Sequence, residues 1–389
     1  MHKKAKLIFK DGTMFEGASF GAETSAAGEI VFATGMVGYP EALTDPSFRG
    51  QILVLTYPLV GNYGVPKKEM WESDKIQVSG LVVSSYIDTP SHHAMRMTLA
   101  EWFKKENVPL IEVKDTRGIT QKIRTEGAML GKIVTNGKDV AFEDPNLRNL
   151  AREASVNKII FEGEGKNTIV ILDCGAKKNI IRNLIKRGFK VAIVPIDTDV
   201  TKLKFKFSAV VISNGPGDPK LATTAINNVK KIIAQKIPTL GICLGNQILA
   251  LALGGATYKM KFGHRSQNQP AVVKTLAGRP VAQGTRTCFL TTQNHGFAVS
   301  RIPKGFKEWF VNGNDGTNEG MIHATLPVMA VQFHPESSPG PLDTDWVFDY
   351  FLQRAGLHAL RRSHAVLEKQ VSFGRSKDSS EHASRPLNK

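Results

Sequence analysis

The sequence has few cysteines and no long apolar segment. Its 389 residues include three widely spaced cysteines, Cys174, Cys243 and Cys288, a number and spacing that suit a reducing compartment better than a disulfide framework. The longest apolar stretch, residues 248–256, is too short to cross a bilayer. The N-terminal decapeptide is charged and lacks the apolar run of a secretory signal. We therefore expect a cytoplasmic protein, with an organelle as the alternative, and no membrane contact.

Glycine-rich nucleotide motifs and metal-binding spacings are also missing. The segment Gly215-x-Gly217 has no third glycine, and residues 164–167 have no hydroxyl after the lysine of a phosphate loop. Cysteines and histidines do not cluster at the spacings of a metal site. We expect no cofactor, nucleotide or metal in this chain, so any ATP chemistry would belong to a partner.

Acidic residues are scarce relative to basic ones, which leaves a formal net charge of +16. Such a surplus can indicate binding to nucleic acid. The lysines and arginines are spread along the chain, however, and are not interleaved with aromatic residues. We expect no nucleic-acid binding, and interpret the charge as a solvated surface or as a face complementary to an acidic partner subunit.

The first part of the chain has strand-like patterns. Between residues 6 and 80, short β-branched runs alternate with turn signals, and residues 92–106 and 119–126 have helical spacing. These patterns predict a β-rich α+β domain over residues 1–150. Residues 162–167 (EGEGKN) have linker composition, so residues 151–167 are predicted to join two domains.

Strands and helices alternate in the second part. Apolar strands are predicted at 168–173, 190–196, 209–213 and 239–242, with helices at 177–187, at 222–235 and after Cys243. Continuous apolar strands with crossover helices favour an α/β domain over residues 168–356 with an open, mostly parallel sheet. Residues 357–389 lose this periodicity and are predicted to form a flexible basic tail.

Cys243 lies at the predicted junction of a strand and a helix. Gly241 and Gly245 flank it in a G-x-nucleophile-x-G arrangement, which permits a sharp turn that exposes the side chain. Peptide dipoles at the start of the following helix favour a thiolate and can bind a developing oxyanion. A lone cysteine is more often a small core residue, and we keep that interpretation for Cys174 and Cys288.

A candidate base follows about ninety residues later. His334 and Glu336 are two residues apart, so in an extended chain their side chains share a face. Pro335 between them cannot donate to a sheet, which favours a strand end. Cys243, His334 and Glu336 are therefore predicted to act as nucleophile, base and orienting carboxylate.

The loop at residues 214–219 (NGPGDP) follows a predicted strand close to Cys243. It can be a structural turn. Because it falls at the same end of the sheet as the cysteine, the N–H groups of Gly215 and Gly217 can alternatively bind an oxyanion or a substrate carboxylate.

Several motifs carry a resemblance to a known family. The segments GICLGNQ (241–247), NGPGDP (214–219), QNHGF (293–297) and HPE (334–336) resemble the class I glutamine amidotransferases, which use a Cys-His-Glu triad. Residues 7–21, 38–52 and 115–117 are similar to the N-terminal domain of the small, glutamine-hydrolysing subunit of carbamoyl phosphate synthetase. The resemblance covers roughly residues 5 to 356.

The resemblance implies a glutamine site. Its residues would be Ser47, Gly215, Gly217, Leu244 through its N–H, Gln247, Asn294, Gly296 and Phe297. Asn246 stands where the family often has histidine, and residues 265–267 replace a stretch that is usually glycine-rich. Neither departure affects the triad, and relatives that depend on ammonia lack the cysteine.

The resemblance also implies a function. L-Glutamine would be hydrolysed to glutamate and ammonia, and the ammonia would pass to a large synthetase subunit or domain, which would hold ATP and Mg and make carbamoyl phosphate from bicarbonate. The sequence leaves open arginine or pyrimidine biosynthesis, and a separate subunit or a piece of a fused polypeptide. Two alternatives are an amidotransferase for anthranilate, GMP or CTP synthesis, against which the N-terminal domain argues, and a non-catalytic basic binding protein, against which the triad argues.

Overall fold

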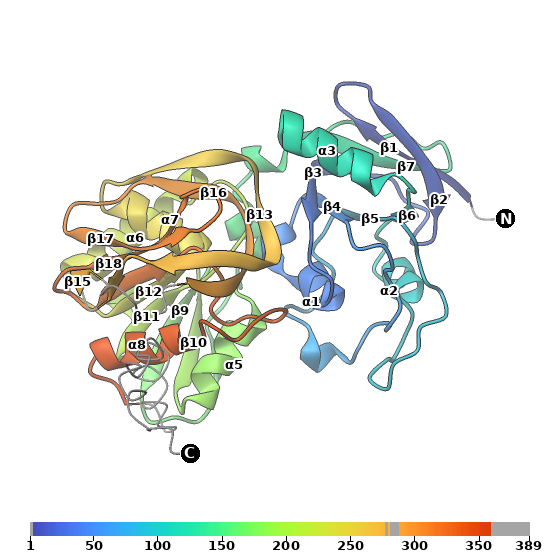
Figure 1. Cartoon of the computed structure of the whole chain (residues 1–389). Coiled ribbons are helices and arrows are strands. Elements are labelled where there is room, and N and C mark those ends of the chain that lie inside the picture. Colours follow the sequence, from blue (N-terminus) through green and yellow to red (C-terminus); the bar gives the residue numbers. More distant parts are fainter. Residues whose placement is uncertain (1–2, 277–278, 281–287, 359–389) are drawn as a thin grey trace, which may run out of the picture.

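The structure is a computed structural model that describes residues 3–276, 279–280 and 288–358, and these residues form two lobes (Figure 1). Most of the predicted basic tail, residues 359–389, lies outside the described residues. The N-terminal lobe, coloured blue to teal in Figure 1, lies beside a larger lobe that contains the rest of the described residues.

The N-terminal lobe is a closed barrel with strand order β1-β2-β6-β5-β4-β3-β7. Its strands and helices are β1 (Lys3–Phe9), β2 (Met14–Ser19), β3 (Ala26–Ala33), α1 (Tyr39–Thr44), β4 (Gln51–Leu55), β5 (Gly80–Val83), α2 (Leu99–Lys105), β6 (Leu110–Glu112), α3 (Thr116–Glu126) and β7 (Met129–Thr135). The barrel closes where β1 pairs antiparallel with β7, with Leu7 opposite Ile133. The β-rich prediction is confirmed, but the closed barrel was not predicted, because local patterns do not show which distant strands pair.

The larger lobe is built on a ten-stranded sheet with order β16-β13-β17-β18-β19-β12-β11-β9-β10-β8. Its strands are β8 (Ile160–Glu162), β9 (Thr168–Asp173), β10 (Lys190–Pro195), β11 (Ala209–Ile212), β12 (Thr239–Ile242), β13 (Ala256–Val273), β16 (Cys288–Arg301), β17 (Phe306–Asn312), β18 (Asn318–His323) and β19 (Val328–Val331). A separate two-stranded sheet pairs β14 (Thr275–Leu276) with β15 (Arg279–Pro280).

The prediction of an open, mostly parallel sheet holds only for the middle of this sheet. Strands β10, β9, β11, β12 and β19 are parallel. Strand β8 at one edge and the run β18, β17, β13 and β16 at the other are antiparallel. The antiparallel strands are joined without crossover helices. They were not predicted because their polar, irregular sequences lack the continuous apolar pattern of buried parallel strands.

Helices cover both faces of this sheet. Its helices are α4 (Leu150–Ala154), α5 (Lys178–Lys186), α6 (Thr223–Ala234), α7 (Leu244–Ala252) and α8 (Trp346–Arg354). Apolar residues of α5 and α8 share one buried cluster with the sheet, and those of α6 and α7 share another. The parallel strands are therefore buried on both faces, which explains their continuous apolar sequences.

The helices predicted at 177–187 and 222–235 form as α5 and α6, with each boundary one residue away from the prediction. Of the helix predicted at 92–106, only α2 forms; it begins after Thr98, whose hydroxyl accepts a hydrogen bond from the Glu101 N–H at 3.1 Å. The segment predicted as a linker, residues 151–167, contains most of α4 and the edge strand β8. Among the described helices, none combines the length and the apolar character needed to cross a membrane.

Candidate active site

Cys243 occupies a sharp turn between β12 and α7. Its backbone angles are φ 54° and ψ −104°, a conformation that L residues rarely adopt. The Cys243 N–H donates to the Val331 carbonyl at 2.8 Å, and this hydrogen bond connects the turn to the last residue of β19. A Cβ atom at Gly241 would lie 2.6 Å from the Gly245 carbonyl oxygen, and one at Gly245 would lie 2.1 Å from the Ile212 carbonyl oxygen. Both glycines are therefore needed for the strand and helix to approach this closely.

His334 lies just beyond the end of β19. Its N–H donates to the Thr292 carbonyl at 2.9 Å, an isolated bridge that links it to β16. Its Nδ1 lies 2.6 Å from Glu336 Oε1, and both side chains are fully buried. The spacing of two residues thus places the pair in contact. His334 Nε2 forms no hydrogen bond of normal geometry within the described residues, yet Cys243 is close enough to affect the pKa of the imidazole.

Charges around this pair shift both pKa values. Burial opposes the charged imidazolium, but Glu336 and then Cys243 outweigh it and raise the pKa of His334 to about 10. Burial also opposes the Glu336 carboxylate, but Lys177 and His334 outweigh it and lower the pKa of Glu336 to about 2. A carboxylate that stays charged can hold the imidazole with Nδ1 protonated and Nε2 directed to the sulfur.

Lys177 is a buried cation that the sequence analysis did not assign to the site. Its Nζ lies 3.2 Å from Glu336 Oε1 and donates to the Ser337 carbonyl at 2.5 Å. Both charged side chains are inaccessible to solvent. No sequence signal distinguished this lysine from the others, because it lies at the start of an ordinary amphipathic helix.

One pocket next to Cys243 brings together most of the predicted glutamine-binding residues. Its lining includes Ser47, Gly215, Gly217, Gln247, Asn294, Gly296 and Phe297, together with Cys243. Leu244 is the first residue of α7, so its N–H has no acceptor within that helix and is available to a ligand. The loop that contains Gly215 and Gly217, residues of strand β16 and the N-terminus of α7 thus lie around Cys243.

The barrel lobe completes the pocket wall. Asn214 Nδ2 donates to Ser47 Oγ at 2.9 Å, and Asn294 Nδ2 donates to Asp45 Oδ2 at 2.9 Å. Asp45 Oδ1 also accepts the Ser47 N–H at 2.9 Å, which fixes the serine. Asp45 was missed as a site residue, although it lies in the motif that indicated Ser47.

Two further polar side chains near the sulfur were also missed. Gln332 Nε2 lies 3.6 Å from Cys243 Sγ, and Gln332 Oε1 accepts a hydrogen bond from Gln247 Nε2 at 3.1 Å. Arg265, expected only as a departure in a loop, lines the pocket and is almost entirely buried. Asn246 donates to Gln332 Oε1 at 3.3 Å and lies in the core of this network.

The other two cysteines do not share these surroundings. Cys174 is buried, and burial, with Asp173 adding to it, raises the pKa of its thiol well above the ordinary value. Cys288 is exposed at the start of β16. Neither lines the pocket of Cys243.

Two family models match this chain, one within each lobe. The family model for glutamine amidotransferase class-I matches residues 170–354, and that for the carbamoyl-phosphate synthase small chain, CPSase domain, matches residues 7–133. The carbamoyl phosphate synthase small chain of Pyrococcus furiosus is 43% identical over 375 residues, which cover 91% of this chain and 98% of that protein. The chain belongs to the carbamoyl phosphate synthase small-chain family.

Relatives in this family differ in length. The arginine-specific small chain of Neurospora crassa is 42% identical over 372 residues, which cover 91% of this chain and 80% of that protein. Multifunctional protein CAD of Squalus acanthias is 46% identical over 367 residues, which cover 90% of this chain but 16% of that protein. The small-chain region therefore occurs both as a short protein and as a minor part of much longer polypeptides.

Proposed function

We propose that this chain is the glutamine-hydrolysing component of a carbamoyl phosphate synthetase, with Cys243, His334 and Glu336 as its catalytic residues. The observation that carries this proposal is the buried His334–Glu336 pair, with its free Nε2 close to a thiol on a strand-to-helix turn. Membership of the small-chain family supports the synthetase assignment over anthranilate, GMP or CTP synthesis, because the N-terminal model match covers the barrel lobe.

The proposed reaction begins with attack of the Cys243 thiolate on the side-chain carboxamide carbon of L-glutamine. The negative charge that develops on the carboxamide oxygen is stabilised by the N–H groups of Leu244 and Gly215. Protonated His334 gives its Nε2 proton to the leaving nitrogen, which departs as ammonia and leaves a glutamyl thioester. His334 then removes a proton from water, which attacks the thioester and releases glutamate and the Cys243 thiolate.

Recognition of the rest of glutamine is proposed for the pocket wall. Ser47, Gly217, Gln247, Asn294, Gly296 and Phe297 line the pocket from both lobes. Arg265 adds a guanidinium that forms no ion pair with a described carboxylate, so a positive charge remains available to the α-carboxylate of the substrate. Lys177 keeps Glu336 ionised and does not contact the substrate.

The ammonia would be consumed by a large synthetase subunit or domain. That partner would hold the ATP and Mg needed to make carbamoyl phosphate from bicarbonate, for arginine or pyrimidine biosynthesis. The relative named as an arginine-specific small chain supports the first of these routes. The small number and wide spacing of the cysteines support a reducing compartment, and we propose the cytoplasm.

The decisive experiment compares nitrogen sources in the complex with the large partner. The Cys243→Ser variant is expected to lose glutamine-dependent carbamoyl phosphate synthesis while keeping synthesis from added ammonia. Cys174→Ser serves as the matched control, because that thiol lies outside the pocket, and it should keep both activities. Glutamine hydrolysis that survives in Cys243→Ser would overturn the assignment of the nucleophile.

A further inference from the structure

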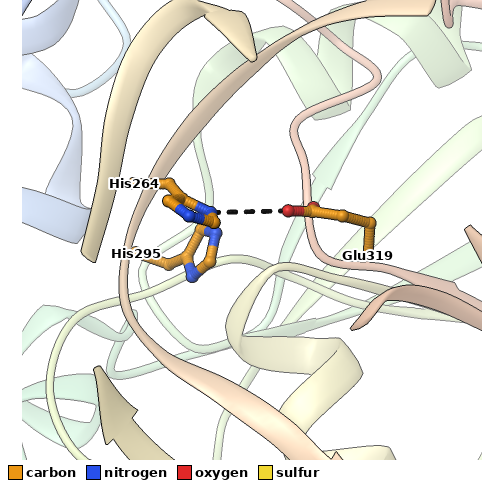
Figure 2. Close-up of side chains that lie close together, drawn as sticks. All are labelled: His264, His295 and Glu319. Atoms are coloured by element: carbon orange, nitrogen blue, oxygen red, sulfur yellow. Dashed lines mark ion pairs between the residues drawn. The ribbon is translucent and has the colours of Figure 1, made fainter. Parts of the chain in front are cut away.

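Three polar residues meet in the antiparallel part of the large lobe, next to the pocket of Cys243. His264 lies on β13, His295 on β16 and Glu319 on β18. Their relative exposures are 6%, 4% and 0%. Figure 2 shows the His264 ring directed at the Glu319 carboxylate, with the His295 ring close beside it. The sequence analysis expected no metal site, because these residues are 31 and 24 positions apart and have no short-range ligand spacing.

The outer nitrogen of each histidine is already held. His264 Nε2 lies 2.9 Å from Asp315 Oδ2, and His295 Nδ1 lies 2.8 Å from the Phe297 carbonyl oxygen. Histidine ligands in metal sites are commonly held in this way, through a carboxylate or a backbone carbonyl on the far side of the ring. When those two nitrogens carry the protons, His264 Nδ1 and His295 Nε2 present lone pairs toward the interior of the cluster.

The inner atoms are poorly satisfied by the protein itself. His264 Nδ1 is 3.4 Å from Glu319 Oε1 and 3.5 Å from Asn312 Nδ2. His295 Nε2 is 3.1 Å from Gln293 Oε1, which is an acceptor. Asn312 Nδ2 donates to Glu319 Oε1 at 3.0 Å, but Glu319 Oε2 is buried without a hydrogen-bond partner of normal geometry among the described residues. The acceptors that this amide does not satisfy call for a further donor or a cation.

The charges around the cluster also favour a cation. Two carboxylates, Glu319 and Asp315, approach the His264 ring from opposite sides. Among the described residues, neither carboxylate forms an ion pair with a lysine or an arginine. A divalent cation would neutralise both.

We propose that His264 Nδ1, His295 Nε2 and the Glu319 carboxylate form a binding site for one divalent transition-metal cation, with Zn²⁺ as the best match. Two imidazoles, one carboxylate and an open fourth position are a known ligand set for zinc, with Zn–N distances of about 2.0–2.1 Å. One ligand atom from each residue lies within 4.8 Å of the others. Bond lengths of that size place tetrahedral ligands about 3.4 Å apart, so side-chain shifts on the order of 1 Å would complete the site.

Metal binding would act on the proposed glutamine pocket through β16. His295 lies between Asn294 and Gly296, and all three line the pocket of Cys243. Movement of His295 toward Glu319 would displace its neighbours, so we expect bound Zn²⁺ to raise the KM for glutamine. This consequence rests on the proposed function, whereas metal binding itself does not.

Binding is tested in a protein without competing thiols. In the full chain carrying Cys243→Ser and Cys288→Ser, one equivalent of Zn²⁺ is expected to bind in equilibrium dialysis, and Co²⁺ is expected to give the visible absorption of a four- or five-coordinate site. Adding Glu319→Gln should weaken binding by at least about 100-fold, since changes to outer partners alone cost about 10–100-fold. Glu308→Gln, on the neighbouring strand β17 and outside the cluster, is the matched control and should bind normally.

Two results would overturn the proposal. One is the absence of the Co²⁺ spectrum in the protein with Cys243→Ser and Cys288→Ser, which is measured before any ligand is changed. The other is unchanged binding in both Glu319→Gln and His264→Asn, with circular dichroism used to verify that each variant is folded.

Kinetics in the enzyme with intact cysteines separates this proposal from the proposed function. Zn²⁺ inhibition of glutamine hydrolysis is attributed to this site to the extent that Glu319→Gln removes it and Glu308→Gln retains it. A Co²⁺ spectrum in a protein without glutaminase activity would refute the proposed function alone, and full activity without metal binding would refute the metal site alone.

Discussion

The large lobe contains two buried histidine–glutamate pairs that differ in their third partner. His334 lies 2.6 Å from Glu336, and Lys177 lies 3.2 Å from the same carboxylate oxygen. His264 lies 3.4 Å from Glu319, and its other nitrogen faces a second carboxylate on Asp315. The first group therefore contains a permanent cation and the second does not.

Because of this difference, the pKa values of the two glutamates shift in opposite directions. Burial opposes ionisation of both, but Lys177 and His334 overcome it at Glu336 and lower its pKa to about 2. At Glu319 burial outweighs His264 and its hydrogen bonds, and the pKa is raised. Histidine and glutamate thus form a short hydrogen bond at His334 and Glu336. At His264 and Glu319, the Glu319 Oε2 atom has no hydrogen-bond partner of normal geometry among the described residues.

The largest expected difference between the pairs is in catalysis. His334→Asn should lower kcat for glutamine hydrolysis by about 10²–10⁴-fold, because general acid and base catalysis is lost. His264→Asn should change kcat by less than about tenfold, because His264 does not line the pocket. Steady-state glutaminase assays of both variants without added metal test this, and equal losses would contradict the distinction.

Removal of Lys177, the cation that only the first pair contains, should lower the free energy of unfolding. Lys177→Met leaves the buried Glu336 with His334 alone as a cationic partner, and removing one partner of a buried ion pair costs about 3–5 kcal/mol. Denaturant unfolding at neutral pH measures the loss. Lys178→Met is the control, because the neighbouring lysine is partly exposed and pairs with exposed Asp74, and it should lose less than about 1 kcal/mol.

A smaller effect should be visible in the pH dependence of stability. The pKa of folded His334 is raised from 6.5 to about 10. Stability from its proton is therefore complete below the unfolded pKa and is lost as pH rises through the folded value. Unfolding free energies measured from pH 6 to pH 10 should show the advantage of the wild type over His334→Asn shrinking across that range, and a constant difference would contradict the raised pKa.

The smallest predicted effect concerns the contact between lobes. Ser47→Ala removes the nearer of the two acceptors of Asn214 Nδ2 and leaves Asp45 Oδ1 at 3.3 Å, and a single neutral hydrogen bond contributes about 0.5–1.5 kcal/mol. We expect the KM for glutamine to rise about 2- to 12-fold on that basis, with a smaller change in kcat. Ser84→Ala in the same lobe is the control, because Ser84 bonds only to the Pro58 carbonyl outside the pocket.

Local sequence predicted the parts of the site that depend on local geometry. The glycines around Cys243 and the two-residue spacing of His334 and Glu336 determine backbone shape within a few residues, so both features were visible. Lys177 and Gln332 reach the site only through pairing of distant strands and helices, and no local pattern identifies such neighbours. The antiparallel extension β18-β17-β13-β16 was missed for the same reason, and with it the convergence of His264, His295 and Glu319.

The hydrogen bonds that Asp45 and Ser47 make to Asn294 and Asn214 have a consequence for the use of the large lobe by itself. A fragment that starts after the barrel would keep the nucleophile and its base but would leave two asparagines facing water instead of their partners. On the proposed function, glutamine hydrolysis therefore depends on contacts between the two lobes, and any change that separates the lobes or brings them closer together is expected to alter turnover.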